Sequence, residues 1–202
     1  MRRNILGFSL LEMSIGLVIV GVIAGISTPS ARLYANHFKH VKEKLIIKEL
    51  NKSVIGYAMT RGGFPDSAAG DLLPSTNIGM SSLNSYDMEI QYYVNTLLNE
   101  STTLGNFTTL CDTAKNILDG TTVSTTPAIC NEVSATFVNC ADSSVVAFVL
   151  VSSGENKAKE HENGDGDQAF ENPTKKPNAV EDYDDVVTSY GLAELANECQ
   201  TL

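Results

Sequence analysis

The sequence predicts an α+β fold, in which one long N-terminal helix packs on a small antiparallel sheet with short extra helices. An apolar run that reaches Ile26 continues as an amphipathic pattern up to Gly62. A second segment, Ser144 to Ser152, is apolar and rich in valine, as a buried strand is. Shorter amphipathic segments lie between the two. The 202 residues are enough for one modest globular domain and an appendage.

The N-terminal apolar run contains one charge. From Phe8 to Ile26, about 19 residues that are long enough to cross a bilayer as a helix, Glu12 is the single charged side chain. A carboxylate inside a membrane helix costs about 2.5 to 3.5 kcal/mol on insertion scales, so it usually has a partner. The run offers no Lys, Arg or His. If the chain were cut between Gly7 and Phe8, the free amine of Phe8 in a neighbouring copy would be a suitable partner.

These residues resemble the signature that type IV prepilins share with the pseudopilins of type II secretion. Members of the family begin with a short basic leader that ends in Gly, followed by Phe and, as the fifth residue after the cut, Glu. Here the pattern is Arg2, Arg3, Gly7, Phe8 and Glu12. The segment between Phe8 and Glu12 differs only conservatively from the commoner Thr-Leu-Ile.

The resemblance implies a structural subunit of a type IV pilus or of a type II secretion pseudopilus, with no enzymatic activity. A prepilin peptidase would cut after Gly7 and methylate the amine of Phe8, and Glu12 would direct assembly with other copies or related pilin subunits. The subunit would sit in the bacterial inner membrane, with its globular domain in the periplasm or on the cell surface. The expected parts are the leader 1–7, a membrane or filament-core helix 8–29, its amphipathic continuation 30–61 and a pilin-like domain 62–202.

Two other N-terminal interpretations remain open. An ordinary secretory signal would also have Arg2, Arg3 and an apolar core, with cleavage after Ala24. A plain single-span anchor is the other. Either would suit a membrane-anchored exported enzyme or binding domain, for instance a hydrolase that uses His161. Glu12 argues against both, and the chain has no nucleophile elbow, phosphate-binding glycine loop or metal-ligating histidine pair.

The net charge of the chain argues against nucleic-acid binding. The net charge of −10 and the pI near 4.7 describe an acidic domain that repels nucleic acid. The basic pair Arg2 and Arg3 precedes the apolar run, so the positive-inside rule places the leader in the cytoplasm and the domain outside.

The pattern beyond the apolar run continues the helix, which is expected from Phe8 to Arg61 with a bend near Pro29. Gly62 and Gly63, followed by a proline at position 65, form a strong stop. Apolar residues recur at helical spacing, and from Leu45 onwards we expect them to pack in the core. They are Tyr34, Phe38, Val41, Leu45, Leu50, Val54 and either Tyr57 or Ala58.

The remaining segments predict short elements. Helices are expected over 88–99 and 107–118, and a third over 191–198. Strands are expected over 133–138, 144–152 and 183–187, of which 144–152 is the strongest and should be buried on both faces. Residues 64–86 are expected to form an irregular connection, 121–126 a polar loop, and the acidic stretch 153–182 a solvated loop or a disordered segment.

Four cysteines, all in the exported part, favour two disulfides. A zinc site is the alternative, but the spacings are wide and the three histidines do not cluster with the cysteines. We predict the pairs Cys111–Cys130, which closes a short local loop, and Cys140–Cys199, which ties down the C-terminal tail.

A structural calcium ion is the one cofactor that the sequence indicates, and no other is expected. The segment 163–174 fails the EF-hand pattern because Gln168 stands where glycine is needed. The acidic loop after the strong strand nevertheless resembles the loop with which major pseudopilins hold a structural calcium. That resemblance implies candidate ligands at Glu155, Asp182, Asp184 and Asp185, although the loop here is much longer.

Overall fold

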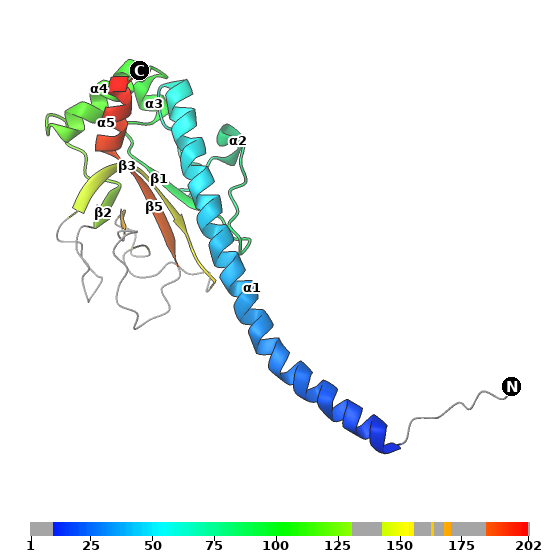
Figure 1. The fold of residues 1–202 in the computed structure, drawn as a ribbon. Coiled ribbons are helices and arrows are strands. Elements are labelled where there is room, and N and C mark those ends of the chain that lie inside the picture. The colour runs from blue at the N-terminus through cyan, green and yellow to red at the C-terminus, as the bar shows by residue number, and fades with distance from the viewer. Residues whose placement is uncertain (1–9, 131–142, 156–162, 164–167, 171–184, 202) are drawn as a thin grey trace. The chain divides into compact units, whose positions relative to one another are not determined.

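The structure, a computed structural model, describes residues 10–130, 143–155, 163, 168–170 and 185–201, and of residues 24–33 it describes only the backbone. The chain forms two compact units, residues 1–39 and 40–202. Helix α1 (Leu10–Arg61) contributes to both, and it continues through Pro29 (Figure 1). The predicted start at Phe8 lies outside the described residues.

Helix α1 ends where the glycine pair predicts. Gly62 adopts φ 72°, and its N–H donates to the carbonyl of Ala58 at 2.8 Å, which is a left-handed helix cap. A Cβ atom at Gly62 would lie 2.5 Å from the backbone nitrogen of Phe107, and one at Gly63 would lie 2.6 Å from the Cα of Glu100. Glycine is therefore required here both for its conformation and for the close approach of two backbones.

The sheet is centred on β3 (Ser143–Ser152). Over Phe148–Val151 this strand pairs antiparallel with both β1 and β5, which must therefore flank it on opposite edges. β3 also pairs antiparallel with β2, and β2 pairs parallel with β4, so the expectation of a purely antiparallel sheet is wrong. The other strands are β1 (Gln91–Val94), β2 (Ala128–Cys130), β4 (Ala169–Phe170) and β5 (Val186–Gly191).

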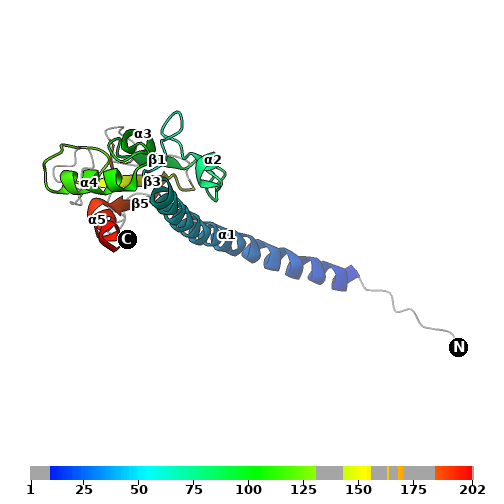
Figure 2. The same cartoon turned by 90° about the horizontal axis from the view of Figure 1, so that it is seen from above.

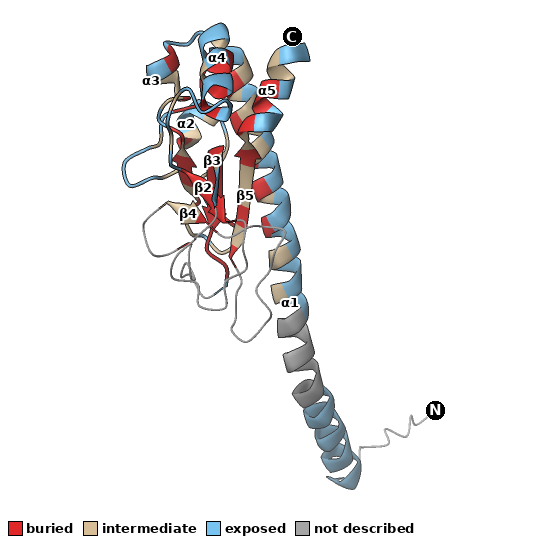
Figure 3. Ribbon diagram, turned by 90° about the vertical axis from the view of Figure 1, so that its left-hand side faces the viewer, coloured by how far each residue is buried: buried red, intermediate tan, exposed pale blue. Residues whose placement is uncertain are grey.

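Strand β3 is buried on both faces, as its apolar sequence predicts. Phe148 and Leu150 belong to the main core with Leu50 and Val54 of α1, whereas Val149 on the other face belongs to a second cluster. From position 147 to 152 each residue of the strand is at most 1% exposed. Figure 3 shows this burial along β3 and along the side of α1 that faces it.

Two helices cover one end of the sheet. α4 (Phe107–Leu118) has the predicted bounds, and the side chain of Asn106 caps its N-terminus by accepting the N–H of Thr108 at 2.9 Å. α5 (Leu192–Thr201) confirms the predicted C-terminal helix. The two helices lie side by side (Figure 2). Two single-turn helices, α2 (Ser75–Ile78) and α3 (Glu100–Thr103), complete the described elements.

The helix expected over 88–99 is wrong. Residues 91–94 form strand β1, in which Tyr92 faces the main core and Tyr93 the second cluster, as period-two alternation requires. The Asn95 side chain then accepts the N–H of Leu97 at 3.1 Å and turns the chain. Two adjacent tyrosines followed by a valine fit a strand, and their contacts on both faces of the sheet outweigh the helical spacing.

Parts of the predicted solvated loop are also buried. Ser153 and Asn163 are 9% and 2% exposed, and Phe170 in β4 is 2% exposed within the second cluster. The loop expectation over 153–182 is therefore wrong at these positions, because they pack against the sheet. The strand expected over 133–138 lies outside the described residues. Of the strand expected over 183–187, the described part forms the start of β5.

Candidate assembly surfaces

The first surface is the N-terminal part of α1, whose large apolar side chains are exposed. Leu10 and Leu17 are 89% and 73% exposed. A Cβ atom at Gly16 or Gly21 would meet nothing within 4 Å. The other exposed apolar side chains of this part are Leu11, Met13, Ile15, Val18, Ile19, Val20, Val22 and Ile23. Within the described residues, the structure contains no helix whose length and apolar character would let it span a membrane.

Of the residues predicted to direct processing and assembly, the structure describes only Glu12. Gly7 and Phe8 lie outside the described residues. Glu12 lies in the first turn of α1, where a carboxylate interacts favourably with the helix dipole, and its side chain is exposed.

The second surface is the outer face of α1 in the larger unit. Ile47, Leu50 and Val54 are at most 2% exposed and face the core. Val41 and Leu45 lie on the opposite side of the helix and are 43% and 58% exposed. The expectation that Leu45 packs in the core is wrong, because the helix contacts the sheet through the positions 47, 50, 54 and 58 instead. Tyr34 and Phe38, in the smaller unit, are also exposed.

A buried carboxylate, which was not predicted from the sequence, lies on the inner face of the same helix. Glu43 is fully buried, accepts the N–H of Ser85 at 2.7 Å and accepts the hydroxyl of Ser152. The Asn84 side chain donates to the Ser152 hydroxyl at 2.9 Å and to the Ser153 carbonyl at 2.8 Å. This polar network joins α1, the turn at 84–86 and the end of β3. The sequence does contain one sign of this network, because Glu43 is a charged residue at a helix position that faces the core.

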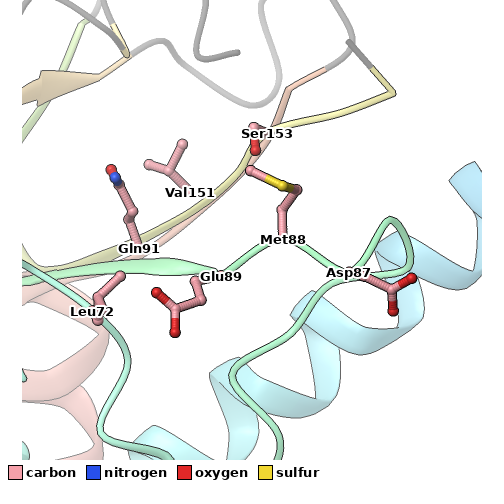
Figure 4. A pocket seen from close by; sticks show the side chains of 7 residues that line it. All are labelled: Leu72, Asp87, Met88, Glu89, Gln91, Val151 and Ser153. Carbon is pink, nitrogen blue, oxygen red and sulfur yellow. The ribbon is translucent and has the colours of Figure 1, made fainter. Parts of the chain in front are cut away.

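The third surface is an open groove of about 400 Å³ beside β1. Figure 4 shows its lining, with the carboxylates of Asp87 and Glu89 pointing away from Met88. Asp87 and Glu89 are exposed, and within the described residues neither forms an ion pair. Residues that line the groove are Leu72, Asp87, Met88, Glu89, Gln91, Val151 and Ser153.

The cysteines pair differently from our prediction. Cys111 of α4 is bonded to Cys199 of α5, with their Cα atoms 5.8 Å apart. The predicted pairs Cys111–Cys130 and Cys140–Cys199 are therefore both wrong. The reason is the packing of α4 on α5, which brings together residues that are 88 positions apart. Cys130 is also disulfide-bonded, and Cys140 lies outside the described residues.

The described residues include two of the four predicted calcium ligands, Glu155 and Asp185. Glu155 is exposed, whereas Asp185 is 7% exposed and accepts a hydrogen bond from the Asn163 side chain at 3.1 Å. Asp182 and Asp184 lie outside the described residues. In the part of the chain that the structure describes, three or more acidic, histidine or cysteine side chains do not gather as metal ligands would.

One tyrosine near the end of α1 has a perturbed pKa. The hydroxyl of Tyr57 donates to the carboxylate of Glu100. Burial, together with this hydrogen bond and the negative charge of Glu100, raises the pKa of Tyr57 to about 12. The Arg61 guanidinium lies 5.9 Å from the centre of the Tyr57 ring and acts in the opposite direction.

Comparison with known proteins gives one match, at the N-terminus of the chain. Residues 2–28 match a family model described as the prokaryotic N-terminal methylation motif. Searches of curated proteins and of solved structures found no significant match.

Proposed function

We propose that this chain, which carries the type IV prepilin and pseudopilin signature at residues 2–28, is an exported pilin-like subunit. It is anchored in the inner membrane by its N-terminal helix and assembles through that helix into a type IV pilus or a type II secretion pseudopilus. A prepilin peptidase removes residues 1–7 and methylates Phe8. The subunit is structural rather than catalytic.

The observation that carries the proposal is the position of the motif on an uncovered apolar helix. Between Leu10 and Ile23, the large apolar side chains are at least 52% exposed. Covering one Leu, Ile or Val side chain contributes about 1.5 to 3 kcal/mol, so this surface gains stability in a bilayer or among the helices of neighbouring copies. The motif accounts for both environments, because such subunits move from one to the other.

The Glu12 carboxylate requires a positively charged partner from a neighbouring helix in the apolar environment. Its charge costs about 2.5 to 3.5 kcal/mol at membrane depth unless a cation neutralises it. Cleavage after Gly7 creates such a cation, the methylated amine of Phe8, in the next copy. The pairing therefore favours a fixed stagger between adjacent helices.

Localisation follows from charge. Arg2 and Arg3 remain in the cytoplasm, and the globular domain lies in the periplasm or at the cell surface. With a net charge of −10 the chain is not a partner for nucleic acid.

We further propose that a calcium ion stabilises the acidic loop through Asp185 and its neighbours. Removal of calcium with a chelator should then lower the unfolding temperature, and an unchanged temperature would exclude the site.

The test of the proposed function uses two substitutions. Gly7→Val should leave the full-length precursor in the membrane, because the peptidase tolerates little variation before the cut. Glu12→Ala should be inserted and cleaved but should not assemble, since removing the charge makes insertion easier while it removes the pairing. Glu49→Ala, a loss of an exposed carboxylate farther along α1, is the matched control and should assemble normally. Normal cleavage of the Gly7→Val chain would contradict the proposal.

A further inference from the structure

Within the larger unit, two surfaces of the chain complement each other but do not meet. The outer face of α1 carries Val41, Leu45 and Lys48, which recur at spacings of four and three and so lie in one stripe. Leu72 and Met88 are apolar residues that line the groove beside β1. No residue of α1 lines it.

Their charges are opposite and have no ion-pair partner in the part of the chain that the structure describes. Lys44 and Lys48 are exposed on the outer face of α1 and form no ion pair there. The same holds for Asp87 and Glu89 at the groove. On a chain of net charge −10, an exposed cluster of lysines beside apolar side chains is a local exception.

The stripe does not reach the groove of its own chain. Residues 47, 50, 54 and 58 turn one side of α1 to the core, and the stripe lies on the opposite side. Contact between the two surfaces therefore requires two copies. A contact between two different patches is heterologous, and when the rotation does not close it produces an open helical filament.

We propose that the groove beside β1 binds the outer face of α1 from a second copy of this chain, with Lys48 of one copy paired to Glu89 of the next and Leu45 against Leu72 and Met88. This inference rests on the proposed function and specifies one contact between the larger units of two assembled copies. Leu45 and Lys48 are three positions apart, so their Cβ atoms are about 5 to 6 Å apart and both side chains enter one groove.

The test is site-directed cross-linking between full-length chains in membranes. One copy carries Lys48→Cys and a co-produced copy carries Glu89→Cys. Mild oxidation should give a dimer that contains both chains. The matched control replaces Glu89→Cys with Asp119→Cys, an exposed acidic position at the end of α4, and should give no dimer. Absence of the Lys48–Glu89 dimer would overturn the inference.

A charge exchange tests the pairing without new cysteines. Lys48→Glu and Glu89→Lys should each reduce the sedimentable assembly, by about fivefold per contact if the pair has the strength of a good exposed ion pair. The double variant should restore the assembly. Two single losses without restoration would show that the residues do not meet.

The same samples separate this inference from the proposed function. If chains cut after Gly7 sediment in a Glu12-dependent manner but show no Lys48–Glu89 dimer, the groove is wrong and the proposed function stands. If chains neither mature nor sediment, both are wrong. A dimer that forms equally in the Glu12→Ala background would place the contact outside the assembly and would also contradict the inference.

Discussion

The disulfide between α4 and α5 offers the sharpest test of the fold. We predict that the double variant Cys111→Ala, Cys199→Ala lowers the free energy of unfolding by about 4 to 5 kcal/mol. The magnitude follows from the 88-residue separation of the two cysteines. In the chain-entropy model a loop of that length removes about 15 cal/mol/K from the unfolded chain, which at 25 °C is about 4.6 kcal/mol.

The native packing around the bond should persist in this variant. Leu110 and Ala114 of α4 and Leu195 of α5 are fully buried in the main core, so the two helices keep their apolar contacts. The loss therefore arises mainly from the greater freedom of the unfolded chain. The loss is about a third of the free energy of unfolding of a very stable domain, and nearly all of that of a marginal one.

The assay is pulse proteolysis of the full-length protein in detergent over a series of urea concentrations. With a slope of about 2 kcal/mol per M, the midpoint should fall by about 2 M. Asp112→Ala, an exposed change in the same turn of α4, is the control and should leave the midpoint unchanged. An unchanged urea midpoint for the double variant would refute this reasoning. So would a Cys111–Cys130 peptide obtained by digesting the unmodified protein without reduction.

Three further predictions follow from buried contacts, each measured as a urea midpoint. Glu43→Leu should cost about 2 to 4 kcal/mol, because it leaves the Ser85 N–H and the Ser152 hydroxyl without their acceptor, and Glu43→Gln should cost less; equal losses would contradict the role of these hydrogen bonds. Gly62→Ala should be far more destabilising than Gly79→Ala: both residues have φ near 70°, but a Cβ meets backbone atoms only at position 62, so similar losses would show that space does not matter. The Tyr57 contribution to the free energy of unfolding should be complete below pH 10, the ordinary tyrosine pKa, and should be lost as the pH rises towards 12, because the fold favours the protonated hydroxyl. Tyr57→Phe should reduce this alkaline loss without abolishing it, because burial also raises the pKa of Tyr92 and of Tyr190; an unchanged alkaline loss would contradict the role of Tyr57.

Where local signals were strong, the sequence predicted the fold correctly. Gly62 ends α1 because its left-handed cap is encoded in the residue itself, and Asn106 caps α4 by the same kind of local chemistry. The apolar run of β3 was sufficient because its burial on both faces leaves no polar alternation.

Errors arose where distant contacts decide the outcome. Tyr93 and Val94 fit the helical spacing that was expected over 88–99, but pairing with β3 makes them part of a strand. Cys111 has a nearby cysteine in the sequence, yet the packing of α4 on α5 brings Cys199 to it. Leu45 continues an apolar stripe along α1, but the sheet contacts the other side of the helix. In each case the contact that decides the structure joins residues that are tens of positions apart in the sequence.

Of the candidate surfaces, only the N-terminal motif can be recognised from the sequence. Residues 2–28, which include Gly7, Phe8 and Glu12, match the methylation motif as one stretch of sequence, and the roles of these three residues stay predictions. The groove beside β1 and the polar network of Glu43 depend on the positions of residues from α1, the 84–89 segment and β3, and no local pattern specifies that arrangement.

The most direct test of the central claim is the N-terminus of the protein purified from membranes. Intact mass and N-terminal peptide mapping should give a chain that begins at Phe8 and carries one methyl group on its amine. A chain that begins at Met1, or one that begins at Gly25 after cleavage by signal peptidase, would contradict the account.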